Sequence, residues 1–138
     1  MESVKVQDYM QRHPVTFQPN TPLAVAVETL LEAKQPGAPV VDSNDNLVGF
    51  VSEQDCLSLM LKASYHCELN AIVSDCMRTE VLTVTGNDSV LTVAETMLGQ
   101  KPKIYPVLDE GRVVGIIDRS RVLSAINSHL KTCFRNAV

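Results

Sequence analysis

The chain has 138 residues, of which 45% are hydrophobic and 20% are charged, and a formal net charge of −4. This length allows one domain or two very small ones, and the composition is ordinary for a globular protein. No apolar run approaches a membrane span, residues 1–5 lack the layout of a signal peptide, and no continuous basic face is present. We therefore expect a cytoplasmic protein with no membrane and no nucleic acid among its partners.

The four cysteines and three histidines are scattered along the chain. No Cys-x-x-Cys pair occurs, and only the neighbours His66 and Cys67 suggest metal ligands, whereas a zinc site needs three or four. We expect reduced thiols and no metal site.

Residues 1–42 predict a short leading helix at 4–10, a brief strand at 15–17, a longer helix and a second strand at 38–41. Thr21 is a favourable N-cap for the longer helix, with Pro22 at its first helical position. Its expected inward stripe has helical spacing and consists of Leu23, Val27, Leu30 and Leu31. The run 23–27 is apolar around most of one turn, which is wider than packing on one sheet requires.

Residues 47–55 join a strand to a helix and carry two polar side chains at the junction. The run Leu-Val-Gly-Phe-Val at 47–51 predicts a strand that leaves a polar turn. Ser52 then lies at a helix N-cap, where free backbone N–H groups can hold a phosphate oxygen. Asp55, one turn on, can accept hydrogen bonds from two vicinal hydroxyls such as those of a ribose. The same Ser-x-x-Asp spacing also predicts a capping box without a ligand, so both interpretations stay open.

An internal repeat decides how the chain is organised. A shift of 67 residues carries the run 6–10 onto 73–77, 28–30 onto 95–97 and 39–42 onto 106–109. The second copy is then one residue shorter, and a shift of 66 carries 49–51 onto 115–117. These matches indicate a duplicated unit, with repeat 1 at 1–66 and repeat 2 at 67–138.

The second repeat predicts the same elements in the same order. They are a strand at 81–84, a helix from Asp88, a hairpin that turns at 110–111, and a last helix that ends near Leu130. The tail 131–138 has no clear period and is expected to fray. The expected inward side chains of the last three helices are Leu57, Met60 and Leu61; Val90, Ala94, Met97 and Leu98; and Val122, Leu123, Ile126 and Leu130. Each half has too little apolar surface to be stable alone. The predicted fold class is therefore α+β, a duplicated β-α-β-β-α unit whose two repeats pack about a pseudo-twofold axis.

This pattern resembles a tandem pair of CBS domains, the module first named in cystathionine β-synthase. The resemblance rests on Asp-x-Met at 8–10 and 75–77, Ala-Pro-Val-Val-Asp at 38–42 and Gly-Phe-Val-Ser-x-x-Asp at 49–55, and runs from about residue 4 to residue 130. It implies a regulatory module that binds AMP, ADP, ATP or S-adenosylmethionine in a cleft between the repeats, with no obligatory cofactor. In that family the aspartate of this last motif holds ribose hydroxyls and the Ser or Thr contacts phosphate. The resemblance thus assigns these roles to Asp55 and Ser52.

The resemblance also implies which residues complete the cleft. Apolar walls for an adenine would come from Phe50, Val51, Ile104 and Tyr105, and backbone groups from Thr79, Val81 and Pro106. Lys103 is the nearest candidate for a phosphate charge, although a solvated loop lysine explains it equally well. Tyr105 can also be an ordinary strand aromatic.

The second copy of the junction departs from the motif. Asp118 replaces the hydroxyl residue and Arg121 replaces the ribose aspartate. Asp118 can still cap a helix, but its carboxylate would repel a phosphate, and a guanidinium has no acceptor for ribose hydroxyls. We expect at most one adenine-nucleotide site per chain.

Two functional hypotheses follow. One is a ligand-sensing module; the other is a scaffold that has lost ligand binding and serves dimerisation or partner docking. We expect a homodimer in either case, because family members often dimerise through such apolar helices. No catalytic residues are expected, since no arrangement of nucleophile and base, paired-carboxylate motif or phosphate-binding glycine loop is visible.

Overall fold

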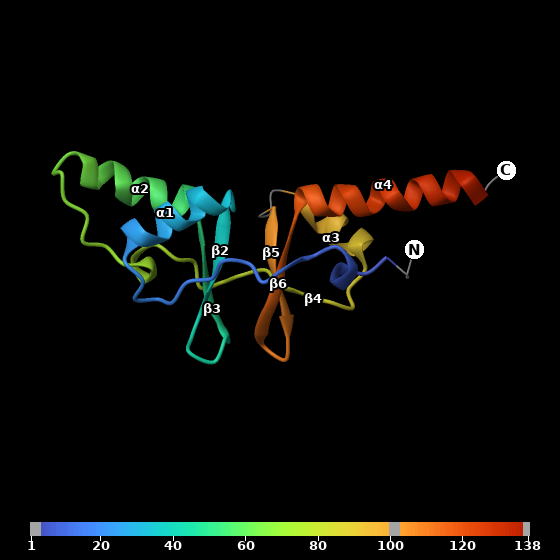
Figure 1. The fold of residues 1–138 in the computed structure, drawn as a ribbon, viewed down its shortest axis with the longest axis horizontal. Helices are drawn as coiled ribbons and strands as arrows, with labels where there is room; N and C mark the ends of the chain where they lie inside the picture. The colour runs from blue at the N-terminus through green and yellow to red at the C-terminus, as the bar shows by residue number, and fades with distance from the viewer. Residues whose placement is uncertain (1–3, 100–102, 137–138) are drawn as a thin grey trace. The chain divides into compact units, whose positions relative to one another are not determined.

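The computed structural model describes residues 4–99 and 103–136 (Figure 1). The chain forms two compact units. Unit 1 comprises Met1–His13, Leu82–Glu110 and Val114–Val138, and unit 2 comprises Pro14–Val81 with Gly111–Val113. Each unit therefore combines most of one repeat with the leading segment of the other, which is 1–13 for repeat 1 and 67–81 for repeat 2.

Unit 2 packs two helices beside a small sheet. Strands β2 (Gly37–Val41) and β3 (Leu47–Ser52) are antiparallel. Bridges from Phe17 to Val40 and from Arg78 to Phe50 extend the pair on both sides. Helices α1 (Leu23–Ala33) and α2 (Glu53–Ser64) pack against each other, and Figure 1 shows them away from the hairpin turn of β2 and β3. The 3-10 helix η2 (Val73–Asp75) precedes Arg78.

Unit 1 has the same design, with a sheet in the order β1-β6-β5-β4. Strand β1 (Gln11–Arg12) is antiparallel to β6 (Arg112–Asp118), and β4 (Val84–Thr85) is parallel to β5 (Ile104–Asp109). Helix α3 (Val90–Met97) packs against α4 (Arg119–Asn136), and the 3-10 helix η1 (Val6–Asp8) precedes β1.

The strand pairings of the two units correspond position by position. The parallel bridge between Phe17 and Val40 recurs, 67 residues on, as the pairing of Val84 with Val107. The antiparallel bridge between Phe50 and Arg78 has its equivalent in the pairing of Ile116 with Gln11. The duplication predicted from the sequence is thereby confirmed in the backbone pairing.

Hydrogen bonds attach each leading segment to the other repeat. In unit 1, the backbone N–H of Val6 donates to Asp88 O at 3.0 Å. In unit 2, Leu23 N donates to Ala71 O and Val73 N to Thr21 O, both at 2.9 Å. Neither compact unit is therefore made from one repeat alone, and the repeat boundary at 66/67 remains a prediction about the sequence.

Each unit has its own hydrophobic core. Buried apolar side chains lose contact with water, which stabilises the fold by about 1.5–3 kcal/mol for each large one. The core of unit 2 consists of Phe17, Leu23, Ala26, Leu30, Ala38, Val40, Val51, Cys56 and Val73. The core of unit 1 consists of Val4, Val6, Met10, Val90, Val93, Met97, Tyr105, Val107, Ile117, Val122 and Ala125.

The helix starts differ from the sequence prediction. Pro22, not Thr21, is the N-cap of α1, and the Thr21 hydroxyl accepts from Gln18 N at 3.1 Å. The physical reason is the bridge between Pro22 and Ile72, which holds Pro22 in an extended conformation. Helix α3 begins at Val90, with Ser89 as its N-cap.

Other element bounds also shift. The expected helix at 4–10 is only the 3-10 turn η1, and the expected strand at 81–84 is β4 at Val84–Thr85. The last helix was predicted to end near Leu130, but α4 continues to Asn136.

The inward helix stripes were predicted only in part. The buried faces hold predicted large side chains, such as Leu23, Leu30 and Met97, together with small ones that the predicted stripes left out, such as Ala26, Cys56 and Ala125. Large side chains predicted to face inward lie outside instead: Leu31 (63% exposed), Leu57 (66%), Leu61 (56%), Leu98 (87%), Leu123 (68%) and Leu130 (43%). The helices of both units thus carry a second, outer apolar face.

Candidate functional site

Ser52 and Asp55 form a complete capping box where β3 passes into α2. Asp55 N donates to Ser52 Oγ at 3.1 Å, and Ser52 N donates to Asp55 Oδ2 at 3.1 Å. The Ser52 hydroxyl also donates to Asp55 Oδ2 at 2.8 Å. The capping interpretation is therefore confirmed, and it fixes the carboxylate of Asp55 at the start of the helix.

The other carboxylate oxygen of Asp55 is held by Arg78. Arg78 Nε donates to Asp55 Oδ1 at 3.1 Å. The side chain of Asp55 is 10% exposed and that of Arg78 is 60% exposed. An ion pair with one partner this exposed contributes at most about 1 kcal/mol. Arg78 can therefore leave Oδ1 at little cost, whereas Oδ2 stays bound in the capping box.

The backbone brings Arg78 to this position. Phe50 N donates to Arg78 O and Arg78 N donates to Phe50 O, each at 2.8 Å. The close approach needs a glycine beside it, because a Cβ on Gly49 would lie 2.8 Å from Arg78 O. The same relation recurs in unit 1, where a Cβ on Gly115 would lie 2.7 Å from Gln11 O. Glycine at both positions thus lets the exchanged leading segment lie against the strand.

The remaining predicted site residues are divided between the two units. Phe50, Val51, Thr79 and Val81 belong to unit 2, whereas Lys103, Ile104, Tyr105 and Pro106 belong to unit 1. Phe50, Val51, Tyr105 and Pro106 are buried, Val81 and Ile104 are half-buried, and Thr79 and Lys103 are exposed. Val51 and Tyr105 are core residues of their units. Their role in a shared cleft remains a prediction.

The second junction is capped but has a different chemistry. Asp118 Oδ1 accepts from Arg121 N at 2.9 Å, as the sequence predicted for a helix cap. Arg121 Nη1 donates to Tyr9 O at 3.2 Å, so its guanidinium contacts the leading segment rather than a carboxylate. At the position equivalent to Asp55, unit 1 thus has the guanidinium of Arg121, which only donates hydrogen bonds, whereas the carboxylate of Asp55 in unit 2 accepts them.

Arg78 was missed in the sequence analysis. Its signal was present in the repeat, because the shift of 67 places Arg78 on Gln11, so a cation replaces a neutral side chain directly after the shared Asp-x-Met. Only the exchange of leading segments shows that this cation faces Asp55.

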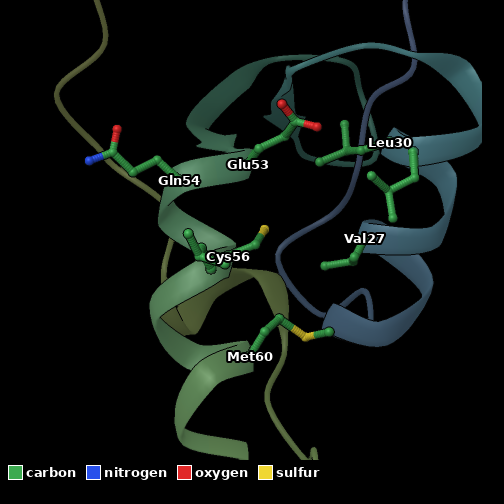
Figure 2. A pocket seen from close by; sticks show the side chains of 8 residues that line it. Val27, Leu30, Glu53, Gln54, Cys56 and Met60 are labelled. Carbon is green, nitrogen blue, oxygen red and sulfur yellow. The ribbon is translucent and has the colours of Figure 1, made fainter. Parts of the chain in front are cut away.

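A groove of about 710 Å³ lies between α1 and α2, apart from this polar junction (Figure 2). Figure 2 shows Cys56 and Met60 pointing from α2 toward Val27 and Leu30 of α1. Leu31 and Leu57 add to its apolar lining, and Glu53 and Gln54 lie near the start of α2. Ser52, Asp55 and Arg78 do not line it.

Residues 4–99 and 103–136 contain neither a candidate membrane span nor a candidate metal site. No helix there has the length and apolar composition needed to cross a membrane. No group of three His, Cys, Asp or Glu residues in this part of the chain is placed to hold a metal ion.

The CBS domain model matches residues 6–62 and 73–128. The chain belongs to the CBS domain family. Its fold agrees, since the CBS-pair protein CBSX2 of Arabidopsis thaliana superposes with a TM-score of 0.82 at 30% identity, covering 92% of this chain and 96% of that one. This confirms the predicted α+β CBS pair.

Related proteins extend this comparison. The chloroplastic CBSX1 of Arabidopsis thaliana is 30% identical over 145 residues, which cover 86% of this chain and 61% of that protein. The protein MJ1225 of Methanocaldococcus jannaschii is 28% identical over 123 residues, 89% of this chain and 43% of that protein. The chain thus spans about half the length of these curated relatives.

Two similar structures contain adenosine compounds. CBSX2 in complex with AMP has a TM-score of 0.78 at 32% identity and covers 90% of this chain and 96% of its own. The CBS domain pair of MJ0100 was solved with 5′-methylthioadenosine and S-adenosyl-L-methionine, with a TM-score of 0.76 at 25% identity, over 91% and 97% of the two chains.

Proposed function

We propose that this CBS pair is a regulatory module that binds one adenosine-containing ligand, of the AMP, ADP, ATP or S-adenosylmethionine class. Membership of the family and the adenosine compounds bound to CBSX2 and MJ0100 support this proposal. The single observation that carries it is the carboxylate of Asp55, which the capping box orients and a weakly held Arg78 covers.

The proposed binding step exchanges one partner of Asp55 for another. Ribose hydroxyls donate to Oδ1 in place of Arg78, while Oδ2 keeps its bonds to Ser52. The displaced guanidinium then pairs with a phosphate, for which it has the better geometry and charge. Arg78 therefore adds to Lys103 as a candidate phosphate ligand, and it favours nucleotides over uncharged adenosine.

The adenine contacts predicted for Phe50, Val51, Ile104 and Tyr105, and the backbone contacts predicted for Thr79, Val81 and Pro106, stay predictions from the sequence. In the second junction Arg121 takes the place of the ribose aspartate and has no acceptor, and the carboxylate of Asp118 would repel a phosphate, so each chain binds one such ligand. The module senses its ligand without catalysing a reaction.

Calorimetric titration of the purified chain with AMP, ADP, ATP and S-adenosylmethionine tests the proposal. We expect saturation at one ligand per chain, and a loss of affinity of about 10-fold or more in Asp55→Asn, because the amide lacks the charge that strengthens the ribose hydrogen bonds. The matched control is Asp118→Asn, which alters the other helix cap and should leave the affinity unchanged. No heat with any of the four compounds, or wild-type affinity in a folded Asp55→Asn protein, would overturn it.

The outer apolar faces favour a second role, dimerisation through the helices. The groove between α1 and α2 is rimmed by Leu31 and Leu57, and Leu61 is exposed on the same helix as Leu57. Apolar surface of this kind marks interaction sites in proteins. We propose that a second copy of the chain covers it, whether or not a ligand binds.

Light scattering tests the dimer. We expect twice the chain mass at micromolar concentration, and the single chain mass for Leu57→Glu, which places a charge in the proposed interface. A matched surface change, Lys62→Glu, should leave the dimer intact. A wild-type monomer at micromolar concentration would refute the proposal.

A further inference from the structure

The second half of helix α4 lies outside the core of unit 1. The helix packs on that core through Val122, Ala125 and Ile126, and Figure 1 shows it running on past α3, the helix that it contacts. From residue 127 to residue 134 every side chain is exposed except the half-buried His129. In proteins most of the stability of a helix comes from packing of its apolar face, so this half lacks its main support within unit 1.

An apolar stripe runs along the exposed side of α4. It consists of Leu123, Leu130 and Phe134, which are 68%, 43% and 69% exposed. These residues follow one another at intervals of seven and four, which places them on one side of the helix. The same spacing forms the seam along which two helices pack. The stripe is therefore suited to contact with other helices.

Charges of opposite sign lie on α4 and on the two helices that form the groove in unit 2. Between residues 119 and 134, α4 contains no Asp or Glu and has a net charge of +3. Asp55 is paired with Arg78, and the other charged side chains of α1 and α2 have a net charge of −2. These exposed groups are Arg119, Arg121 and Lys131 on α4, and Glu28, Glu32, Glu53 and Lys62 on α1 and α2. An apolar groove between acidic helices thus complements an apolar stripe on a basic helix.

We propose that α4 of one copy docks in the α1–α2 groove of a second copy, so that unit 1 of each chain contacts unit 2 of the other. The apolar stripe then covers Leu31 and Leu57, the exposed leucines of the groove. Each copy has one α4 and one groove, so a twofold dimer uses each of them once. Contact between like surfaces would instead set acidic helices against acidic ones and basic against basic. This inference rests on the dimerisation proposed above and adds which surfaces meet.

Charge reversal in the full chain tests which surfaces meet. Glu28→Lys with Glu32→Lys changes the net charge of the groove helices from −2 to +2, and Arg119→Glu with Lys131→Glu changes that of α4 from +3 to −1. Each double variant should raise the dimer dissociation constant, measured by sedimentation equilibrium at low salt, by about 10-fold, because like charges then face each other at both contacts. The chain with all four changes should regain affinity, because its surfaces are again of opposite sign.

The outcome differs if like surfaces meet. Reversing one surface then reverses both sides of the same contact, and the dissociation constant does not rise. Folded double variants that dimerise as tightly as the wild type, or a fourfold variant that dimerises no more tightly than the double variants, would overturn the proposed docking and leave the dimer itself standing.

Phe134→Ser tests the apolar stripe. Because Phe134 lies outside the core, the variant should fold normally and raise the dissociation constant by about 100-fold, since two such side chains are buried in each dimer. The matched control is Leu82→Ser, which removes a 42% exposed apolar side chain outside the helices and should leave the dissociation constant unchanged. An unchanged dissociation constant in Phe134→Ser would overturn the docking of α4 alone, whereas a monomeric wild-type chain would overturn both this inference and the dimer.

Discussion

The substitution Gly49→Ala should destabilise unit 2, because β3 and the exchanged segment that carries Arg78 approach each other too closely for a side chain at this position. A Cβ at this position would lie 2.8 Å from Arg78 O and 2.8 Å from Met77 Sδ. The methionine side chain can move aside. The carbonyl of Arg78 cannot move alone, because it accepts from Phe50 N at 2.8 Å and belongs to the segment that carries the partner of Asp55.

The expected cost follows from these contacts. Inserting a methyl group into a packed site costs about 1–3 kcal/mol. Weakening one hydrogen bond of the bridge adds about 0.5–1.5 kcal/mol. The free energy of unfolding should therefore fall by about 2–4 kcal/mol. The structurally equivalent Gly115→Ala, whose Cβ would lie 2.7 Å from Gln11 O, should behave alike.

Urea unfolding followed by circular dichroism measures this loss. The control is Gly111, which has φ +81° but open space, since the nearest atom to an added Cβ is 3.9 Å away. There the cost is backbone strain of about 1 kcal/mol, and Asn should recover part of it. At Gly49, Asn should be worse than Ala. If Gly49→Ala loses no more stability than Gly111→Ala, the close approach does not limit the fold.

Three further predictions follow from buried and turn residues. Tyr105→Phe should lower the free energy of unfolding by less than about 1 kcal/mol, or raise it, because the buried hydroxyl has no hydrogen-bond partner among the described residues. A loss of several kcal/mol in thermal unfolding would show that the hydroxyl has a partner. The free energy of unfolding should decrease above pH 9, because burial raises the pKa of Cys56 to about 12 and the unfolded chain therefore releases this proton first. The slope of the free energy against pH approaches about 1.4 kcal/mol per pH unit. An equally steep slope in Cys56→Ala would contradict the assignment to Cys56. Asp42→Asn should weaken the β2–β3 turn at neutral pH, because the backbone N–H groups of Asn44 and Asn46 bond to the Asp42 carboxylate and lower its pKa. The stability from these bonds is present above the ordinary pKa of aspartate and is lost as the pH falls below it, so the variant should lose less stability in acid. Unchanged acid unfolding of the variant would refute this prediction.

The exchange of leading segments brings together, within unit 2, the two residues on which the proposed site depends. Asp55 belongs to the first repeat and Arg78 to the leading segment of the second. A ligand that displaces Arg78 would act directly on the contact between these two segments. This offers a physical route from ligand binding to a change in repeat packing, as a sensor requires.

Much of the candidate site could be predicted from the sequence. The capping box at Ser52 and Asp55 follows from local spacing, because both partners lie within one helical turn. The loss of the ribose acceptor in the second copy follows from reading Arg121 against Asp55. Arg78 could not be assigned, because its partner lies 23 residues away and depends on which repeat the leading segment joins.

The helix faces show the same division. Helical spacing identified apolar residues such as Leu57 and Leu123, but it could not say which of two apolar faces meets the sheet. Close packing decided this, since Cys56 and Ala125 fit against their sheets and the leucines remain outside.

Patterns along the chain were enough to predict the duplication, the order of helices and strands, the CBS fold and the two polar residues of the junction. Each of these depends on local spacing or on a repeat that is visible along the chain. The exchange of the leading segments and the ion pair between Arg78 and Asp55 are visible only in the folded chain. These depend on contacts between residues distant in sequence, which form when burial of both cores selects one partner for each segment.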